Sequence, residues 1–234
     1  MSMRERSESR AAVRRHPPRF TAAQGAAVAK LAYAAEHRAA VALLCGPAGV
    51  GKTMLLEHVA AAGLPGSRRV KLFDAGEALA THGDGLATEG VVEVLFVDEA
   101  DRLPGADLVA CVESWRRRWP DVAIVLAGQG RLLSLCSGDR RLESLVRLRI
   151  TLPTFSLDET RDLLGPLFAD AGADGAIACD ADVVETIHEI AGGVPAVALW
   201  LADMARVLAA GEAEHRLSAD DVEAIHRRLC LHAA

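Results

Sequence analysis

Long apolar runs are missing from this sequence. No apolar segment reaches the roughly 18 residues that a membrane-spanning helix requires. The first ten residues, MSMRERSESR, are largely charged or polar, and no hydrophobic stretch follows them. We therefore expect no membrane insertion and a cytoplasmic location.

Cysteine is scarce and dispersed. The five cysteines form no C-x-x-C pair and have no histidine at metal-ligand spacing. They are Cys45, Cys111, Cys136, Cys179 and Cys230. The pattern indicates neither a disulfide framework nor a zinc site, and we expect buried, reduced thiols.

An excess of positive charge is also missing, because the formal net charge is −6. This balance argues against a protein covered with DNA-binding surface, although local basic patches remain possible. The most basic segment, residues 1–19, is predicted to be a flexible tail, either simply solvated or an interaction arm. A second basic run, Arg116 to Arg118, lies between Trp115 and Trp119, which either pack half-buried or form a partner or nucleic-acid patch.

The apolar residues, 51% of the chain, are arranged in segments that alternate between two periodicities. Short apolar runs typical of buried strands alternate with segments of helical spacing, and this alternation predicts an α/β fold with a parallel, doubly wound, five-stranded sheet. The expected strands are residues 41–45, 69–73, 91–97, 122–126 and 148–152. The expected helices in this region follow Thr21, follow the glycine-rich loop up to Gly63, and span about 106–119.

After Pro153 the strand signals stop and four helix starts follow. Ser156 with Glu159 forms a capping-box pattern, Pro195 follows Gly192-Gly193, and Asp180 and Ser218 begin the other two helices. We therefore expect three parts: a tail over 1–19, an α/β domain over 20–153 and a small all-α lid domain over 154–234.

The segment GPAGVGKT, Gly46 to Thr53, fits the P-loop pattern G-x-x-x-x-G-K-[ST] and lies between an apolar strand and a helix. Its backbone N–H groups can surround phosphate oxygens, and Lys52 can reach the β- and γ-phosphates. The Thr53 hydroxyl can ligate Mg²⁺. The sequence therefore predicts a site for ATP and Mg²⁺, formed by Gly46, Pro47, Ala48, Gly49, Val50, Gly51, Lys52, Thr53 and Met54.

The segment VLFVDEAD, Val94 to Asp101, is an apolar strand that ends in acidic residues. Asp98 is placed to hold Mg²⁺, and Glu99 to orient or deprotonate the attacking water. The alternative is that this acidic pair only begins a helix. With the P-loop upstream, the pair favours an NTP hydrolase.

Several blocks resemble AAA+ ATPases of the ExeA/GspA-type secretion group. They are FTAAQGAAVAKLAY, FVDEADRL, VLAGQGRL, LPTFSLDET, AGGVPAVALWLADMA and LSADDVEA, which occur in the family's order between Phe20 and Ala224. The chain is also similar to TniB-type transposition ATPases and archaeal origin-recognition ATPases. The resemblance implies an AAA+ core with a helical lid, and it makes Gln129 the first sensor that positions water. Without the resemblance, Gln129 would be interpreted as a turn residue.

Two arginines that the resemblance implies are absent. The family's L-x-Q-R-I segment aligns with Leu142 to Val146, so that Leu145 stands at the position of the arginine finger. The lid motif G-G-x-P-R corresponds to Gly192 to Ala196, so that Ala196 replaces the lid arginine. Of the neighbouring Arg140, Arg141, Arg147 and Arg149, one could substitute as a cation acting on another subunit, or they are solvated or face nucleic acid.

These patterns predict a slow ATPase that acts as an ATP-dependent switch in macromolecular assembly. A protein partner is expected, and DNA binding and a homo-oligomer are possible. The alternative, favoured by the missing arginines, is a pseudoenzyme or interaction module that binds ATP and scarcely hydrolyses it.

Overall fold

The computed structural model describes residues 20–37, 40–62, 69–81, 92–169, 179–180, 182–210 and 216–232. The predicted tail, residues 1–19, lies outside the described residues. The chain divides into two compact units. The first, the α/β unit, comprises Met1–Gly46 and Lys52–Leu152, and the second, the helical unit, comprises Pro47–Gly51 and Pro153–Ala234. The expected domain bounds at 153 and 154 stay a prediction.

A five-stranded parallel sheet forms the centre of the α/β unit, with the strand order β2-β3-β4-β1-β5. The strands are β1 (Val41–Cys45), β2 (Val70–Phe73), β3 (Val94–Val97), β4 (Ala123–Gly128) and β5 (Val146–Thr151). Every described residue of β1, β3 and β4 is buried. Such wholly apolar strands are typical of a parallel sheet that helices cover on both faces.

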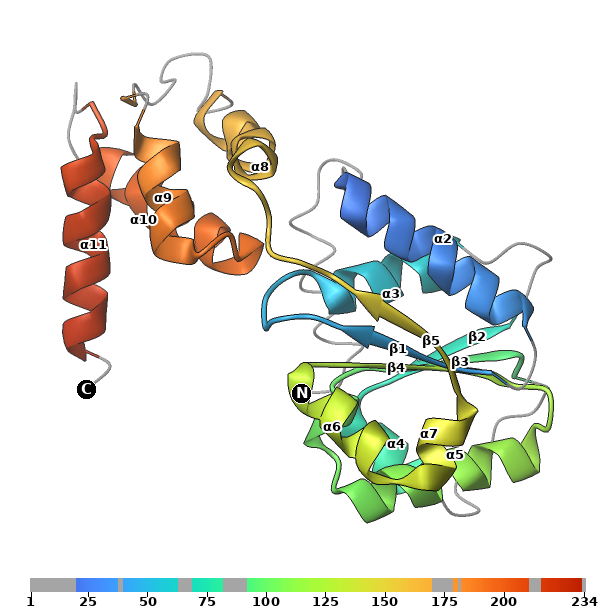
Figure 1. Ribbon diagram of the computed structural model, residues 1–234. Coiled ribbons are helices and arrows are strands. Elements are labelled where there is room, and N and C mark those ends of the chain that lie inside the picture. The colour runs from blue at the N-terminus through green and yellow to red at the C-terminus, as the bar shows by residue number, and fades with distance from the viewer. Residues whose placement is uncertain are drawn as a thin grey trace. The chain divides into compact units, whose positions relative to one another are not determined.

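Helices cover both faces of this sheet (Figure 1). On one face lie α2 (Ala22–Glu36) and α3 (Lys52–Ala62). On the other lie α4 (Ala75–Thr81), α5 (Gly105–Arg118), α6 (Gly130–Gly138) and α7 (Arg140–Leu145). A short 3-10 turn, η1 (Ala100–Arg102), follows β3. Thr21 caps α2 through a complete capping box with Gln24, as the sequence suggests.

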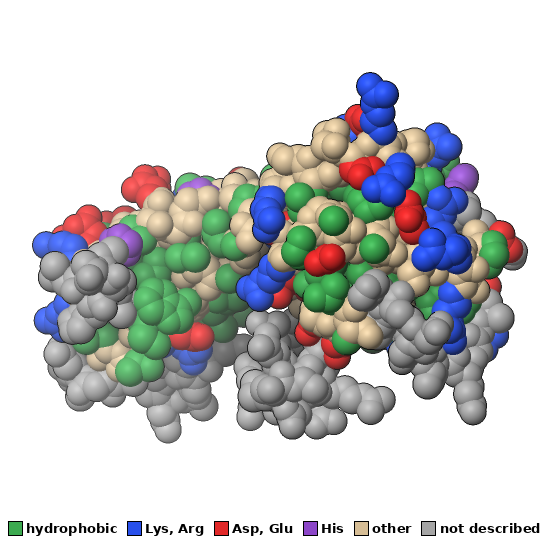
Figure 2. Space-filling view, turned by 90° about the horizontal axis from the view of Figure 1, so that it is seen from below, with side chains coloured by type: hydrophobic (Ala, Val, Ile, Leu, Met, Phe, Trp, Pro, Cys, Tyr) green, Lys and Arg blue, Asp and Glu red, His purple; other side chains and the backbone are tan. Residues whose placement is uncertain are grey.

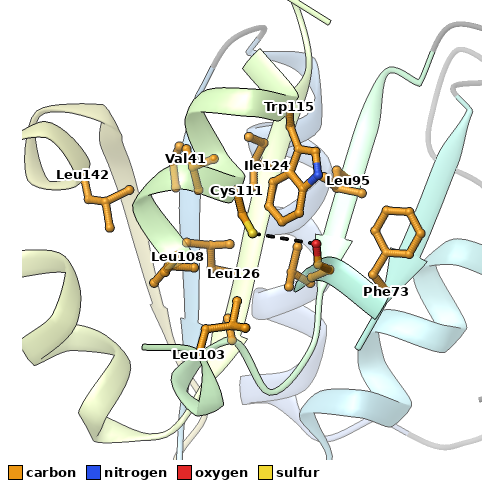
Figure 3. Packing of buried hydrophobic residues seen from close by; sticks show 14 of the residues in the cluster. Val41, Phe73, Leu95, Leu103, Leu108, Cys111, Trp115, Ile124, Leu126 and Leu142 are labelled. Carbon is orange, nitrogen blue, oxygen red and sulfur yellow. Dashed lines mark hydrogen bonds between the residues drawn. The ribbon is translucent and has the colours of Figure 1, made fainter. Parts of the chain in front are cut away.

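The core between the sheet and α5 is built around Trp115, which is 1% exposed. Figure 3 shows Trp115 and Leu108 of α5 packed with Ile124 and Leu126 of β4. The Cys111 thiol donates to the Ala78 carbonyl oxygen at 3.7 Å. Burial raises the pKa of Cys111 and of Cys136 to about 11, so these thiols stay protonated near neutral pH. Trp119 is also buried, so both tryptophans are packing residues.

The helical unit has its own core around Leu164, Ile187, Leu201 and Val222. It contains α8 (Leu157–Ala169), α9 (Val183–Ala191), α10 (Pro195–Ala210) and α11 (Ala219–His232). Gly192 and Gly193 connect α9 to α10 with φ of 57° and 70°, values that glycine adopts readily. A Cβ atom at Gly193 would lie 2.4 Å from the Phe155 carbonyl oxygen, whereas one at Gly192 would meet nothing within 4 Å.

The predicted fold class is confirmed: a five-stranded, parallel, doubly wound α/β unit is followed by helices. The chain between Gly130 and Leu145, for which no element was predicted, forms α6 and α7. Strand β3 begins at Val94, later than the expected Val91, which lies outside the described residues. In the described part of the chain, no helix combines the length and apolar character needed to cross a membrane.

Candidate nucleotide-binding site

The glycine-rich loop connects the carboxyl end of β1 to the start of α3. Gly49 and Gly51 have φ of 79° and 98°, in the left-handed region that side chains with a Cβ rarely adopt. The Gly46 N–H donates to the Gly128 carbonyl oxygen at 3.3 Å, so the base of the loop is attached to the end of β4. In an open α/β sheet, the crevice beyond the carboxyl ends of the strands is where ligands bind.

Of the other loop residues, Val50 is buried, whereas Pro47 and Ala48 are exposed. Met54 is half-buried in the first turn of α3. Gly49 belongs to the helical unit, where its carbonyl oxygen accepts a hydrogen bond from the Ala196 N–H at 3.2 Å. A Cβ at Gly49 would lie 2.9 Å from both the Ala196 Cβ and the Val194 Cγ1 atoms. Gly49 therefore lacks room for a side chain as well as having a left-handed backbone.

Lys52 begins α3, and its Nζ donates to the Gly46 carbonyl oxygen at 2.8 Å. The ammonium group is thus held at the phosphate-binding loop. Burial lowers the pKa of Lys52, while the negative charges of Asp98 and Asp101 act in the opposite direction. Two carboxylates therefore help to keep this half-buried lysine charged.

Thr53 and Asp98 come together although 45 residues separate them in the sequence. The Thr53 hydroxyl donates to Asp98 Oδ2 at 2.5 Å. Asp98 is 3% exposed and follows β3 directly, and its Oδ1 accepts the Glu99 N–H at 2.9 Å. A hydroxyl and a carboxylate oxygen in contact are the donor set that Mg²⁺ uses beside phosphates.

Glu99 lies next to Asp98 with a left-handed backbone, φ 53° and ψ 29°. Its carboxylate forms an ion pair with Arg102, 3.0 Å from Oε2 to Nη1, and both side chains are substantially exposed. A non-glycine residue in this conformation is strained, and such strain is concentrated at functional sites. The proposed base is therefore present at the acidic strand end, with its carboxylate attached to Arg102.

Gln129 directly follows β4 and is the N-cap residue of α6. Its side chain forms no capping hydrogen bond and is exposed. Because β4 lies between β1 and β3 in the sheet, its carboxyl end is next to the glycine-rich loop and the acidic turn. Gln129 is thus placed at the same edge of the sheet as Lys52 and Asp98.

Two further residues at this edge were not predicted. Asp101 is 8% exposed, and its Oδ1 packs so closely on Gly128 that a Cβ there would lie 2.4 Å away. The Arg131 guanidinium donates from Nη1 to the Asp101 carbonyl oxygen at 2.8 Å. The sequence signals were the second aspartate of DEAD and an arginine two residues after Gln129.

The structure also describes the two positions at which the family's arginines are missing. Leu145 ends α7 and packs partly buried against the core of the α/β unit. Ala196 lies exposed in the first turn of α10. Arg141, a possible substitute, is bound within its own chain to Asp139 at 3.1 Å and to Glu113 at 3.2 Å.

No model of a known protein family matches the chain, and no curated protein matches its sequence. Solved structures do match. The Aeropyrum pernix ORC1 protein in complex with DNA has a TM-score of 0.63 and 20% identity, covering 91% of this chain and 66% of that one. The ORC2 protein of the same organism, in ADPNP-ADP complexes, has a TM-score of 0.61 and 17% identity over 89% and 68% of the chains.

The RuvB Holliday junction branch migration motor of Thermotoga maritima is also similar, with a TM-score of 0.57 and 20% identity. The match covers 84% of this chain and 66% of the RuvB chain. The chain thus spans about two thirds of the length of these proteins. The similarity establishes the fold as that of AAA+ P-loop NTPases with a helical carboxyl-terminal part.

Proposed function

We propose that this chain with an AAA+ fold binds ATP with Mg²⁺, hydrolyses it slowly and acts as an ATP-dependent switch. The observation that carries the proposal is the hydrogen bond between Thr53 and Asp98, which unites the end of the glycine-rich loop with the acidic strand end. Lys52 lies beside this pair and supplies the cation for the β- and γ-phosphates.

The side chains that would hold Mg²⁺ are Thr53 and Asp98. Their oxygen atoms fit the ion because Mg²⁺ prefers oxygen ligands and is usually bound by one or two protein groups together with phosphates. When bound, Mg²⁺ neutralises charge that develops on the phosphate oxygens. The chain's own loop amides and Lys52 bind and orient the triphosphate.

Glu99 would accept the proton of the attacking water, and Gln129 would position that water. Both lie at the carboxyl ends of neighbouring strands, beside Asp98. Turnover by the isolated chain should be slow, because Leu145 and Ala196 place no cation at the two positions that the resemblance assigns to arginine.

As a switch, the protein would bind a macromolecular partner differently with and without ATP, since a ligand shifts an equilibrium only by its differential affinity. The resemblance to secretion and transposition ATPases suggests a protein partner in assembly, with DNA binding and self-association possible and a cytoplasmic location. On the face drawn in Figure 2, basic side chains are spread among apolar, polar and acidic ones. A DNA site on that face would therefore depend on individual basic side chains and not on one continuous basic patch.

A second candidate is an ATP-binding interaction module with little hydrolysis. The ion pair between Glu99 and Arg102 favours this candidate, because it engages the carboxylate that would accept the proton of water. The module and the enzyme share the nucleotide site and differ only in turnover.

Two variants test both candidates. Lys52→Ala should weaken ATP binding about tenfold or more, because a charge-assisted contact to phosphate is lost, while the fold stays intact. Lys30→Ala, an exposed lysine on α2, is the control. Equal affinity of well-folded Lys52→Ala and wild-type protein in a titration with fluorescent ATP would disprove the site.

Glu99→Gln should retain ATP binding and reduce phosphate release by about 10²-fold or more, because the base is lost and the shape is kept. Glu143→Gln, exposed on α7, is its control. If wild type binds ATP but releases no more phosphate than Glu99→Gln, with and without DNA or a partner lysate, the module is the correct description.

A further inference from the structure

Arg131 places a guanidinium group at the edge of the sheet that carries the proposed ATP site. It lies in the first turn of α6, two residues after Gln129 and three after the end of β4. Its Nη1 donates to the carbonyl oxygen of Asp101, which belongs to the same acidic turn as Asp98 and Glu99. A cation is thus fixed beside the residues proposed to hold Mg²⁺ and activate water.

The guanidinium of Arg131 remains available for a ligand. Among the described residues, its only polar contact is the one to the Asp101 main chain, and its side chain is exposed. A guanidinium has five N–H donors in a planar fork that suits phosphate oxygens, so most of its donors are unused. By contrast, Arg102 is paired with Glu99, and Arg141 is paired with two acids.

The carboxylate of Asp101 does not capture Arg131. Its Oδ1 is packed against Gly128, while its carbonyl oxygen receives the guanidinium. No ion pair joins the two side chains in the described part of the molecule. The buried negative charge therefore favours a cation nearby without occupying its donors.

Three of the other candidate arginines lie at the far edge of the same sheet. Arg140 and Arg141 precede β5, and Arg147 is its second residue, so all three are at the amino end of this strand. The strands are parallel, which puts these arginines at the opposite edge of the sheet from the loop that follows β1. The six residues of β5 span about 20 Å, and this length separates the amino end of the strand from its carboxyl end at the edge of the glycine-rich loop.

From these contacts we infer that Arg131 is a catalytic residue, which donates to the γ-phosphate of ATP bound in the same chain. The inference rests on the proposed function. In the reaction, the oxygen of water bonds to the γ-phosphorus, and the bond from this phosphorus to the bridging oxygen breaks. The bonding electrons stay on ADP, Glu99 takes the proton of the water, and inorganic phosphate leaves. Arg131 offsets negative charge on the transferring group, the role lost at Leu145 and Ala196.

The experiment compares Arg131→Ala, Arg131→Lys and wild type in the full chain, with Arg69→Ala as the control. Arg69 is an exposed arginine that directly precedes β2, at the amino edge of the same sheet. Loss of one preorganised donor to a transition state reduces kcat by about 10² to 10³, so we expect about a 10²-fold loss in Arg131→Ala. Lysine should restore part of the rate, and the Kd of MgATP should change less than threefold.

Two further measurements separate a catalytic from a structural role. Guanidinium chloride at low, non-denaturing concentration should raise the rate of Arg131→Ala and leave Arg69→Ala unchanged. MgADP with fluoroaluminate, which mimics the transferring phosphoryl group, should bind wild type tightly and Arg131→Ala weakly, while MgADP alone binds both equally.

The possible outcomes are distinct. Wild-type protein that does not bind MgATP would disprove the proposed function itself. Wild type that binds, together with an Arg131→Ala protein of equal kcat and equal fluoroaluminate affinity, would overturn the inference alone. So would a specific activity that rises with protein concentration, because the cation would then come from a neighbouring subunit.

Discussion

At the scale of single residues, Glu99 is the one non-glycine residue with a left-handed backbone in the described part of the chain. Its carboxylate is bound to Arg102, three residues later, in an exposed ion pair. Such pairs contribute about 1 kcal/mol or less, since water and salt screen them. The pair therefore restrains the carboxylate of Glu99 only weakly, and removing Arg102 should change the rate of hydrolysis by no more than this free energy allows.

Arg102→Ala should raise the rate of ATP hydrolysis by up to about fivefold, because 1 kcal/mol corresponds to about that factor. Affinity for MgATP should not change, since no hydrogen bond or ion pair joins Arg102 to the glycine-rich loop in the described part of the chain. Phosphate release at saturating ATP measures the effect, with Arg69→Ala alongside. A marked fall in turnover would show that Arg102 supports the reaction instead of restraining Glu99.

The sequence located the residues of the proposed site better than their conformations. The P-loop and DEAD patterns identify Lys52, Thr53 and Asp98 because their chemistry requires those residue types at those spacings. The left-handed Glu99 and the contact between Arg131 and Asp101 could not be predicted, because both depend on how η1 packs against the end of β4.

At the scale of elements, the connection between α9 and α10 provides a matched pair of glycines. Gly192 and Gly193 both have positive φ, but only Gly193 faces the main-chain oxygen of Phe155. Gly192→Ala should cost about 1 to 2 kcal/mol, the price of a left-handed alanine. Gly193→Ala should cost clearly more, because the backbone at Phe155 must move as well.

Urea unfolding followed by circular dichroism gives both free energies. The comparison has its own internal control, since the two residues are adjacent and differ mainly in the space beside them. Equal losses of stability in the two variants would contradict the close approach of Gly193 to Phe155.

Helix α5 is anchored by Trp115, whose indole Nε1 is buried without a hydrogen-bond partner. Trp115→Ala should destabilise the α/β unit by about 3 to 5 kcal/mol through the cavity it leaves. Trp115→Phe should cost less than half as much, because it keeps most of the ring volume and removes the unsatisfied N–H group. The same unfolding experiment distinguishes the two, and equal losses would show that the N–H group finds a partner.

Elements of strong periodicity were predictable, and weakly marked ones were not. Strand β1 has the predicted bounds, and α5 begins within one residue of its expected start, because a continuous apolar run defines the strand and apolar residues at helical spacing define the helix. Helices α6 and α7 are short, and α6 begins at Gly130 and ends at Gly138, so propensity and pattern give little signal there. Their helical state depends on packing of Leu132 and Leu142 into the core.

At the scale of the whole molecule, each unit has a separate apolar core. A ligand that binds only the folded state stabilises that state by mass action, by about 2.7 kcal/mol at a concentration of 100 times Kd. Lys52, Thr53 and Asp98 belong to the α/β unit, so we expect MgATP to raise the melting temperature of the transition of that unit in calorimetry. The shift should disappear in Lys52→Ala.

Gly193→Ala serves to identify the transition of the helical unit in the same experiment, since the glycine lies in that unit. A melting profile with no shift at saturating MgATP would contradict the nucleotide site.

Strand β5 lies at an edge of the sheet, and this position bears on how the protein behaves at high concentration. An edge strand offers unpaired main-chain groups to which other chains can add. Arg147 and Arg149 are exposed on β5, between residues with apolar side chains. Without these two charges the six residues would form an uncharged segment rich in β-branched residues, of the kind that aggregates. The two arginines thus help to keep the protein in solution, whatever else they bind.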